Sequence, residues 1–233
     1  MQQASGGTRM REPRLTDQPA FDRALDRLLK RDPALRPLFA ATGRPALRRR
    51  EPGLAGLVHV VIAQQVSTAS AGAISPRLEG MLGGPPQALA LRAAAADGTL
   101  RAAGISAPKI RTLAALGEAV ADGAVDLDAL AGMEADAAAA RLTALRGVGP
   151  WTAAIYLLFC LGRGDAFPVG DLALQVAAGE GLGDGTRLTA AALADRAEAW
   201  RPLRGVAAHL LWAYHHACRA TSATPAPRGS RSG

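Results

Sequence analysis

Residues 145–175, LRGVGPWTAAIYLLFCLGRGDAFPVGDLALQ, are the most informative stretch of the chain. They contain the turn Gly147-Val148-Gly149, then an apolar segment, then Asp171 before a second apolar segment. Glycine has no Cβ, so the backbone can turn sharply there and come close to a ligand. A helix that begins at Gly149-Pro150 points unpaired N–H groups outward, and such an end binds phosphate. Asp171 could then act on the molecule that carries the phosphate.

Composition favours an all-α protein. The chain is 49% hydrophobic but only 4% aromatic, and much of the apolar content is alanine, a strong helix former. A length of 233 residues allows one large domain or two small lobes. We expect helices nearly throughout, among them 68–82 with Ser67 as its N-cap, 149–161, 171–178 and 203–219.

The two ends of the chain differ from its middle. Residues 1–14 and 221–233 are polar and rich in Gly, Pro or Ser, which predicts disorder. The N-terminus has no apolar core of a signal peptide, and no stretch is apolar enough to span a bilayer. We therefore expect a cytoplasmic protein without membrane contact. The net charge of +7 arises within residues 1–50, which hold 12 basic and 5 acidic residues, so charge alone says little about DNA binding.

The hairpin LRGVGPWTA and the segment FPVGDLAL resemble the helix-hairpin-helix superfamily of base-excision DNA glycosylases, and within it the DNA-3-methyladenine glycosylase II type. The resemblance covers roughly residues 50–218. Three further segments support it: IAQQVS (62–67), GISAPKIRTL (104–113) and RPLRGVAAHLLW (201–212).

The resemblance implies a two-lobed helical bundle with a helix-hairpin-helix motif and a cleft between the lobes. The glycosylase domain would cover residues 15–220. Its central lobe would lie at about 51–165, and its second lobe would combine 15–50 with 166–220. Family members with an iron–sulfur cluster carry four clustered cysteines, whereas this chain has only Cys160 and Cys218. We therefore expect no iron–sulfur cluster and no other cofactor.

By resemblance, Asp171 is the catalytic residue. A carboxylate stabilises the positive charge that develops on the sugar when an N-glycosidic bond breaks, and it can orient the attacking water. The alternative is that Asp171 only caps a helix, because Asp is a preferred N-cap residue. The two roles are compatible.

By resemblance, Gly147, Val148, Gly149 and Thr152 hold a DNA phosphate through the hairpin. This contact positions the protein without reading sequence. A monovalent cation shared by hairpin carbonyls is a further expectation. The alternative is a helix–helix turn without a ligand.

Three aromatic residues are candidates for a pocket that receives a flipped base: Trp151, Trp212 and Tyr156. Their electron-rich faces would attract a cationic methylated purine. Core packing remains the alternative for each. In the family, glycosylases with lyase activity place a lysine at the position of Trp151, and tryptophan cannot form a Schiff base. This predicts a monofunctional enzyme.

Gln64 and Gln65 follow an apolar helix and could contact a groove or fill the gap left by a flipped base. Simple helix termination is the alternative. Lys109 and Arg204 could contact phosphate or pair locally. The four histidines do not combine with acidic residues into a metal-ligand set, so no metal site is expected.

The sequence thus predicts a monofunctional DNA glycosylase that removes alkylated purines such as 3-methyladenine from double-stranded DNA in base excision repair. We expect it to be monomeric, bacterial in type and associated with the nucleoid. Two alternatives stay open. One is a non-catalytic helix-hairpin-helix DNA-binding protein, and the other is a glycosylase for deaminated or mismatched bases.

Overall fold

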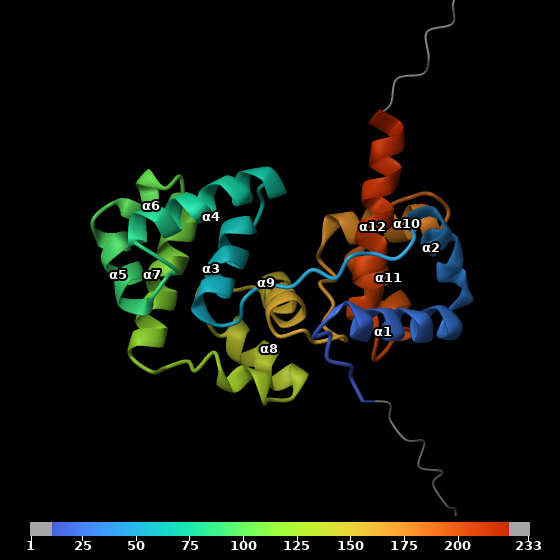
Figure 1. Cartoon of the computed structure of the whole chain (residues 1–233), viewed down its shortest axis with the longest axis horizontal. Helices are drawn as coiled ribbons and strands as arrows, with labels where there is room; N and C mark the ends of the chain where they lie inside the picture. Colours follow the sequence, from blue (N-terminus) through green and yellow to red (C-terminus); the bar gives the residue numbers. More distant parts are fainter. Residues whose placement is uncertain (1–10, 224–233) are drawn as a thin grey trace, which may run out of the picture. The chain divides into compact units, whose positions relative to one another are not determined.

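The computed structural model describes residues 11–223, and the described part of the chain is helical without a sheet (Figure 1). Only an isolated bridge between Arg14 and Arg163 has strand geometry there. The all-α class predicted from composition is confirmed. Within the described residues, no helix is both long and apolar enough to cross a membrane.

The chain divides into two compact units, and each has its own core. The hairpin unit consists of Glu12–Thr16 and Arg48–Pro168. The terminal unit consists of Asp17–Leu47 and the described parts of Met1–Arg11 and Val169–Gly233.

The hairpin unit is built from helices α3 to α9, and α5 packs along α7 while α3 packs on α4 (Figure 1). Ser67 caps α4 through a hydrogen bond from the Ser70 N–H, as the sequence predicted. The elements are α3 (Gly53–Ala63), α4 (Thr68–Leu82), α5 (Ala88–Ala96), α6 (Thr99–Ala102), α7 (Ala107–Ala121), the 3₁₀ turn η2 (Ala129–Ala131), α8 (Ala135–Thr143), α9 (Pro150–Ile155) and the π-helical turn η3 (Tyr156–Cys160).

The π-helical turn corrects one prediction. A single α-helix over 149–161 was expected, but α9 ends at Ile155 and the chain continues as η3. A π turn widens the helix and shifts which side chains face the core. All five residues of η3 are buried.

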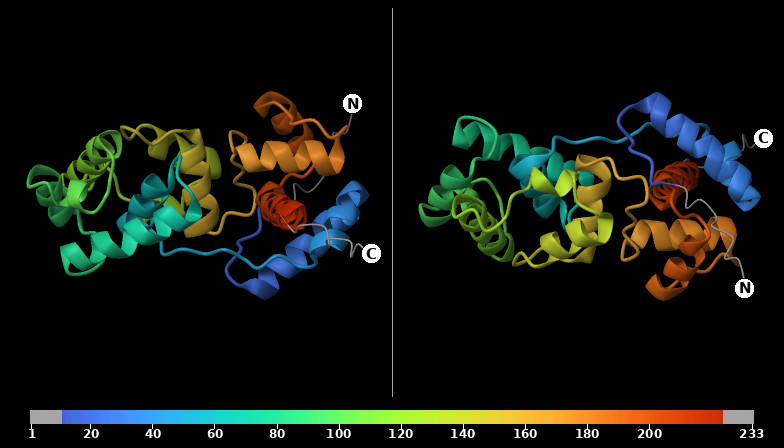
Figure 2. Two further views of the ribbon diagram at one scale, coloured as in Figure 1. Left: turned by 90° about the horizontal axis from the view of Figure 1, so that it is seen from above. Right: turned by 90° about the horizontal axis from the view of Figure 1, so that it is seen from below.

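The terminal unit is organised around α12, which packs against α10, α2 and α1 (Figure 2). Val206, Ala207, Leu210 and Leu211 of α12 are completely buried and recur at helical spacing. The elements are α1 (Gln18–Arg31), the 3₁₀ turn η1 (Pro33–Leu35), α2 (Arg36–Thr42), α10 (Leu172–Leu182), α11 (Ala190–Glu198) and α12 (Arg204–Ala223).

The ordered part of the chain extends further toward both ends than composition predicted. Glu12 pairs with the buried guanidinium of Arg163, with 3.2 Å between Nη1 and Oε2. Leu15 is fully buried, and its N–H donates to the Gly162 carbonyl at 2.7 Å. At the other end, α12 continues to Ala223. The prediction of disorder was therefore wrong for residues 12–14 and 221–223, and its remainder lies outside the described residues.

Candidate functional site

The two hairpin glycines meet different demands. Gly147 has a φ of +80°, which favours glycine, and a Cβ there would collide with the Thr112 hydroxyl. Gly149 has an ordinary φ of −86°, and open space surrounds the position of its missing Cβ. Val148 between them is buried and anchors the turn, while both glycines are exposed. The fold thus requires glycine at position 147. At position 149 the fold would accept a side chain, and glycine there keeps the neighbouring backbone accessible.

The hairpin presents an unused donor to solvent. The Val148 N–H donates to the Leu145 carbonyl at 3.0 Å, and the Gly149 carbonyl accepts from the Ala153 N–H at 3.0 Å. The N–H of Gly149 has no acceptor within residues 11–223. Since Gly149 is exposed, this N–H can bind an anion without moving the backbone.

Thr152 does not fit a direct phosphate contact through its side chain. It is only 2% exposed, and its hydroxyl oxygen accepts from Gln64 Nε2 at 2.7 Å. Gln64 Nε2 also donates to the Gly147 carbonyl at 3.3 Å. The Thr152 side chain therefore packs inside the hairpin. Through these two hydrogen bonds, Gln64 also contacts the hairpin.

Gln65 differs from Gln64 in backbone and exposure. It is the one non-glycine residue between 11 and 223 with a positive φ, at 53°, and its side chain is exposed. A non-glycine residue in the left-handed region is uncommon and is often found at functional sites. A cavity of about 260 Å³ adjoins this loop and is lined by Ile62, Gln64, Gln65, Val66, Ile74, Gly104, Ile105, Ser106 and Lys109.

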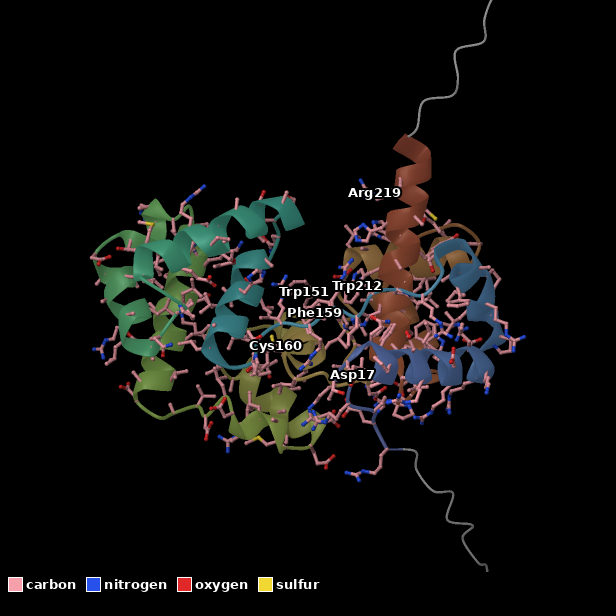
Figure 3. The ribbon with its side chains drawn as sticks, viewed as in Figure 1. Asp17, Trp151, Phe159, Cys160, Trp212 and Arg219 are labelled. Atoms are coloured by element: carbon pink, nitrogen blue, oxygen red, sulfur yellow. The ribbon has the colours of Figure 1, made fainter. Side chains whose placement is uncertain are left out.

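Asp171 is the N-cap of α10, as its sequence context predicted. Its Oδ1 accepts from the Leu174 N–H at 3.1 Å and from Trp212 Nε1 at 3.1 Å. Trp212 lies on α12 and is 7% exposed (Figure 3). The ring of His209 meets the indole edge-on, with 6.0 Å between ring centroids. The carboxylate is therefore held in a defined orientation by a backbone and a side-chain donor.

The remaining aromatic candidates separate clearly. Trp151 lies half-buried in the first turn of α9 (Figure 3). Tyr156 has no exposed surface, and its hydroxyl accepts from the Gly53 N–H at 2.9 Å. Burial raises the pKa of Tyr156 to about 12. The structure thus gives Tyr156 the core position that the sequence left as its alternative.

The cationic candidates make contacts within the chain. Lys109 Nζ donates to the Ile62 carbonyl at 2.7 Å. Arg204 Nη1 pairs with Glu198 Oε1 at 3.2 Å. His59 on α3 is half-buried, and burial, helped by the nearby charge of Arg50, lowers its pKa to about 4. His59 is therefore neutral at pH 7.

No group of three or more His, Cys, Asp and Glu side chains gathers into a potential metal site anywhere in the described chain. For a monovalent cation the hairpin offers backbone carbonyls only. Those of Leu145 and Gly147 already accept hydrogen bonds.

Sequence reasoning missed two residues at these sites. Thr112 packs against the bend at Gly147, and nothing in its own sequence context indicates this. Leu172, next to Asp171, is 58% exposed although it is apolar. A large exposed apolar side chain directly after a candidate catalytic residue indicates a binding surface. Its exposure is known only from the structure, so the sequence alone could not give this indication.

The described chain thus combines an all-α fold with a glycine hairpin that exposes an unpaired N–H and with a carboxylate held by two donors, the features of the helix-hairpin-helix class. No protein-family model matches the chain. Among curated proteins, the chain is 35% identical over 208 residues to a Mycobacterium tuberculosis protein named "Probable bifunctional transcriptional activator/DNA repair enzyme AlkA". That match covers 85% of this chain and 41% of the relative, so the chain spans about two fifths of the relative's length.

Two solved structures are similar to this chain over most of its length. The DNA-3-methyladenine glycosidase of Bacillus halodurans is 30% identical with a TM-score of 0.73, over 91% of this chain and 95% of that one. The 3-methyladenine DNA glycosylase Mag1 of Schizosaccharomyces pombe, solved with abasic DNA, is 27% identical with a TM-score of 0.73, over 82% and 95%. The chain belongs to the helix-hairpin-helix superfamily of DNA glycosylases.

Proposed function

We propose that this protein is a monofunctional DNA glycosylase that removes alkylated purines such as 3-methyladenine from double-stranded DNA. The observation that carries the proposal is the carboxylate of Asp171, held on Oδ1 by the Leu174 N–H and by Trp212 Nε1. Capping alone needs only the first of these bonds. A second donor from another helix fixes the direction of the carboxylate, which a catalytic group requires and a cap does not.

The proposed reaction is hydrolysis of the bond between C1′ and the base nitrogen. The bond's electron pair leaves with the base, and positive charge develops on C1′ and the ring oxygen. Asp171 stabilises that charge and orients a water molecule. The water oxygen bonds to C1′, its proton passes through the carboxylate to solvent, and the products are free base and an abasic site. A base that is already cationic leaves as a neutral molecule, so no separate acid is needed.

Trp212 supports the choice of a cationic purine. A nucleotide whose C1′ is within reach of Asp171 must also lie near the indole, because the indole N–H touches the carboxylate. A π face beside the leaving base favours a base with positive charge. Trp151 is a second candidate for the pocket. Its position also supports the absence of lyase activity, since it stands where the lyases of the family carry lysine.

The hairpin would supply the phosphate contact, through the exposed N–H of Gly149. Gln65 is our candidate for the residue that enters the duplex where the damaged base leaves, because it is exposed and held in a left-handed backbone conformation. The S. pombe structure with abasic DNA supports DNA as the partner. We also propose that one chain suffices, since all these residues come from a single copy, and that the protein acts on DNA in the bacterial nucleoid.

The test is a substrate panel. Purified protein is incubated with duplexes that contain 3-methyladenine, hypoxanthine, uracil or a mismatch, and released bases are separated by chromatography. We expect release of 3-methyladenine at least tenfold faster than release of the others. Faster release of a deaminated base would overturn the assignment to alkylated purines. Binding without release of any base would show a DNA-binding protein instead.

A further inference from the structure

The two adjacent glutamines after α3 differ in their surroundings. Gln64 is half-buried, and its carboxamide nitrogen donates to Thr152 Oγ1 at 2.7 Å and to the Gly147 carbonyl at 3.3 Å. Gln65 is exposed, at a φ of 53°. A carboxamide nitrogen has two hydrogens, so these two acceptors can use both donors of Gln64.

The acceptors of Gln64 lie on the two sides of the hairpin turn. Gly147 closes the turn, and Thr152 belongs to α9 after it. Gln64 itself is the C-cap of α3. One side chain therefore joins the end of α3 to both sides of the hairpin.

Helix α7 reinforces this junction. Thr112 fills the space beside Gly147, where a Cβ would collide with its hydroxyl. Lys109, one turn earlier on α7, donates to the Ile62 carbonyl at 2.7 Å in the last turn of α3. Gln64, Lys109 and Thr112 together connect α3, α7 and the hairpin.

The α3–α4 loop borders a cavity on one side, and Ser67 at its far end caps α4. The cavity of about 260 Å³ is lined by Gln64, Gln65 and Val66 of the loop, and by Lys109 on α7. Side chains that line a cavity lack packing partners on that side. The conformation of the loop must then depend more on the hydrogen bonds of Gln64 than it would in a filled core.

We propose that Gln64 is a positioning residue that fixes the spacing between the hairpin and the loop that carries Gln65. This rests on the proposed function, in which the hairpin binds a phosphate and Gln65 enters the duplex. Gln64 keeps its amide on the protein and does not enter the DNA. Because Gln64 precedes Gln65 directly, movement of the hairpin changes the place at which Gln65 meets the duplex.

The first experiment needs no DNA. Amide hydrogen exchange is measured in the wild type, in Gln64→Glu and in Gln65→Glu, the matched control. A carboxylate has the shape of the carboxamide but no donor, and it would face the oxygens of Thr152 and Gly147. We expect exchange at Val148 and Ala153 to become at least tenfold faster in Gln64→Glu and to stay within twofold in the control. Unchanged exchange in Gln64→Glu overturns the proposal, whether or not the protein proves to be a glycosylase.

The second experiment measures affinity for undamaged duplex and for a duplex with an abasic analogue. In Gln64→Glu we expect both affinities to fall about tenfold, because the hairpin and the loop that carries Gln65 no longer keep the spacing at which they meet the duplex. Gln65→Ala should weaken only binding to the abasic duplex. A Gln64 variant that lost affinity for the abasic duplex alone would show that Gln64 itself enters the DNA.

The pH profile separates positioning from a general loss of structure. The carboxyl of Gln64→Glu would be half-buried and would face two oxygens, so its pKa should lie above the ordinary value of about 4.3, and when it is protonated it regains one donor. Its affinity for undamaged duplex should therefore recover at least threefold between pH 8 and pH 5, relative to the wild type and to Gln64→Leu at the same pH values. Gln64→Leu cannot regain a donor. An equal pH response in both variants overturns the proposal, and this holds even if either variant is less stable.

Discussion

At the scale of single residues, the two hairpin glycines make a matched pair. Gly147→Ala places a Cβ against the Thr112 hydroxyl at a φ of +80°. We expect a loss of about 1–3 kcal/mol in unfolding free energy, from backbone strain and overpacking. Gly149→Ala meets open space at an ordinary φ and should change stability by less than about 1 kcal/mol. Thermal unfolding of both variants checks this, and equal destabilisation would contradict it.

Gly149→Ala should instead weaken DNA binding. Its methyl group occupies the exposed space next to the N–H that we assign to phosphate. Because phosphate contacts carry no sequence information, affinity for lesion and undamaged duplex should fall by a similar factor. Fluorescence anisotropy on the two duplexes measures this. A change in lesion preference would contradict the phosphate contact and would show that Gly149 contributes to the base pocket.

Trp212 has two separable roles at the residue scale. Trp212→Phe keeps an aromatic face but removes the donor to Asp171 Oδ1. We expect single-turnover base release about tenfold slower, with affinity for lesion DNA within threefold, because a reoriented carboxylate stabilises the transition state less well. Trp212→Ala should also lose about 1–3 kcal/mol of affinity for lesion DNA by loss of stacking. If both variants lost affinity for undamaged duplex equally, Trp212 would serve the core alone.

At the scale of elements, α3 should give the protein a pH-dependent stability through His59. The pKa of His59 is about 4 in the folded protein, whereas an unfolded histidine has a pKa of about 6.5. Between these values the unfolded chain binds more protons, so stability is full above pH 6.5 and falls as the pH drops toward 4. His59→Gln should reduce this fall. Thermal unfolding between pH 7 and 4.5 tests it, and identical profiles would show that His59 does not titrate as described.

The elements that local sequence determines were predicted well. Ser67 caps α4 and Asp171 caps α10 because each polar residue precedes an apolar run and finds N–H groups within three residues. Tyr156 lies in the core, which is the alternative that the sequence left open for it.

The contacts between elements could not be predicted from the sequence. Gln64 meets Thr152 across 88 residues, and Trp212 meets Asp171 across 41. Such pairs form only when helices pack, and no spacing within one helix reveals them. The sequence therefore indicated which residues belong to the candidate sites, while the structure showed which of them contact one another.

At the scale of the whole molecule, the two units carry different parts of the proposed activity. The hairpin unit holds the phosphate contact and Gln65, and the terminal unit holds Asp171 and Trp212. Variants at Gly149 should therefore lower the affinity for every duplex, whereas variants at Asp171 should slow base release.

The whole chain should release base without cutting the strand. Lys30 and Lys109 are its only lysines, Trp151 occupies the lyase position, and the Lys109 amine is bound to the Ile62 carbonyl. Treatment of a reacting mixture with borohydride should therefore trap no covalent protein–DNA adduct. An adduct would show that a lysine or the N-terminus attacks C1′, and the assignment to a water-using enzyme would be wrong.

The central claim is that Asp171 performs the chemistry, and Asp171→Asn tests it most directly. Asparagine caps helices as well as aspartate and still offers an oxygen to Leu174 and Trp212, so the fold should persist. The measurement is single-turnover release of 3-methyladenine at saturating protein, beside the affinity for lesion DNA. We predict that release is abolished while affinity stays within about tenfold, because charge is removed and shape is kept. Release at the wild-type rate would contradict the catalytic assignment.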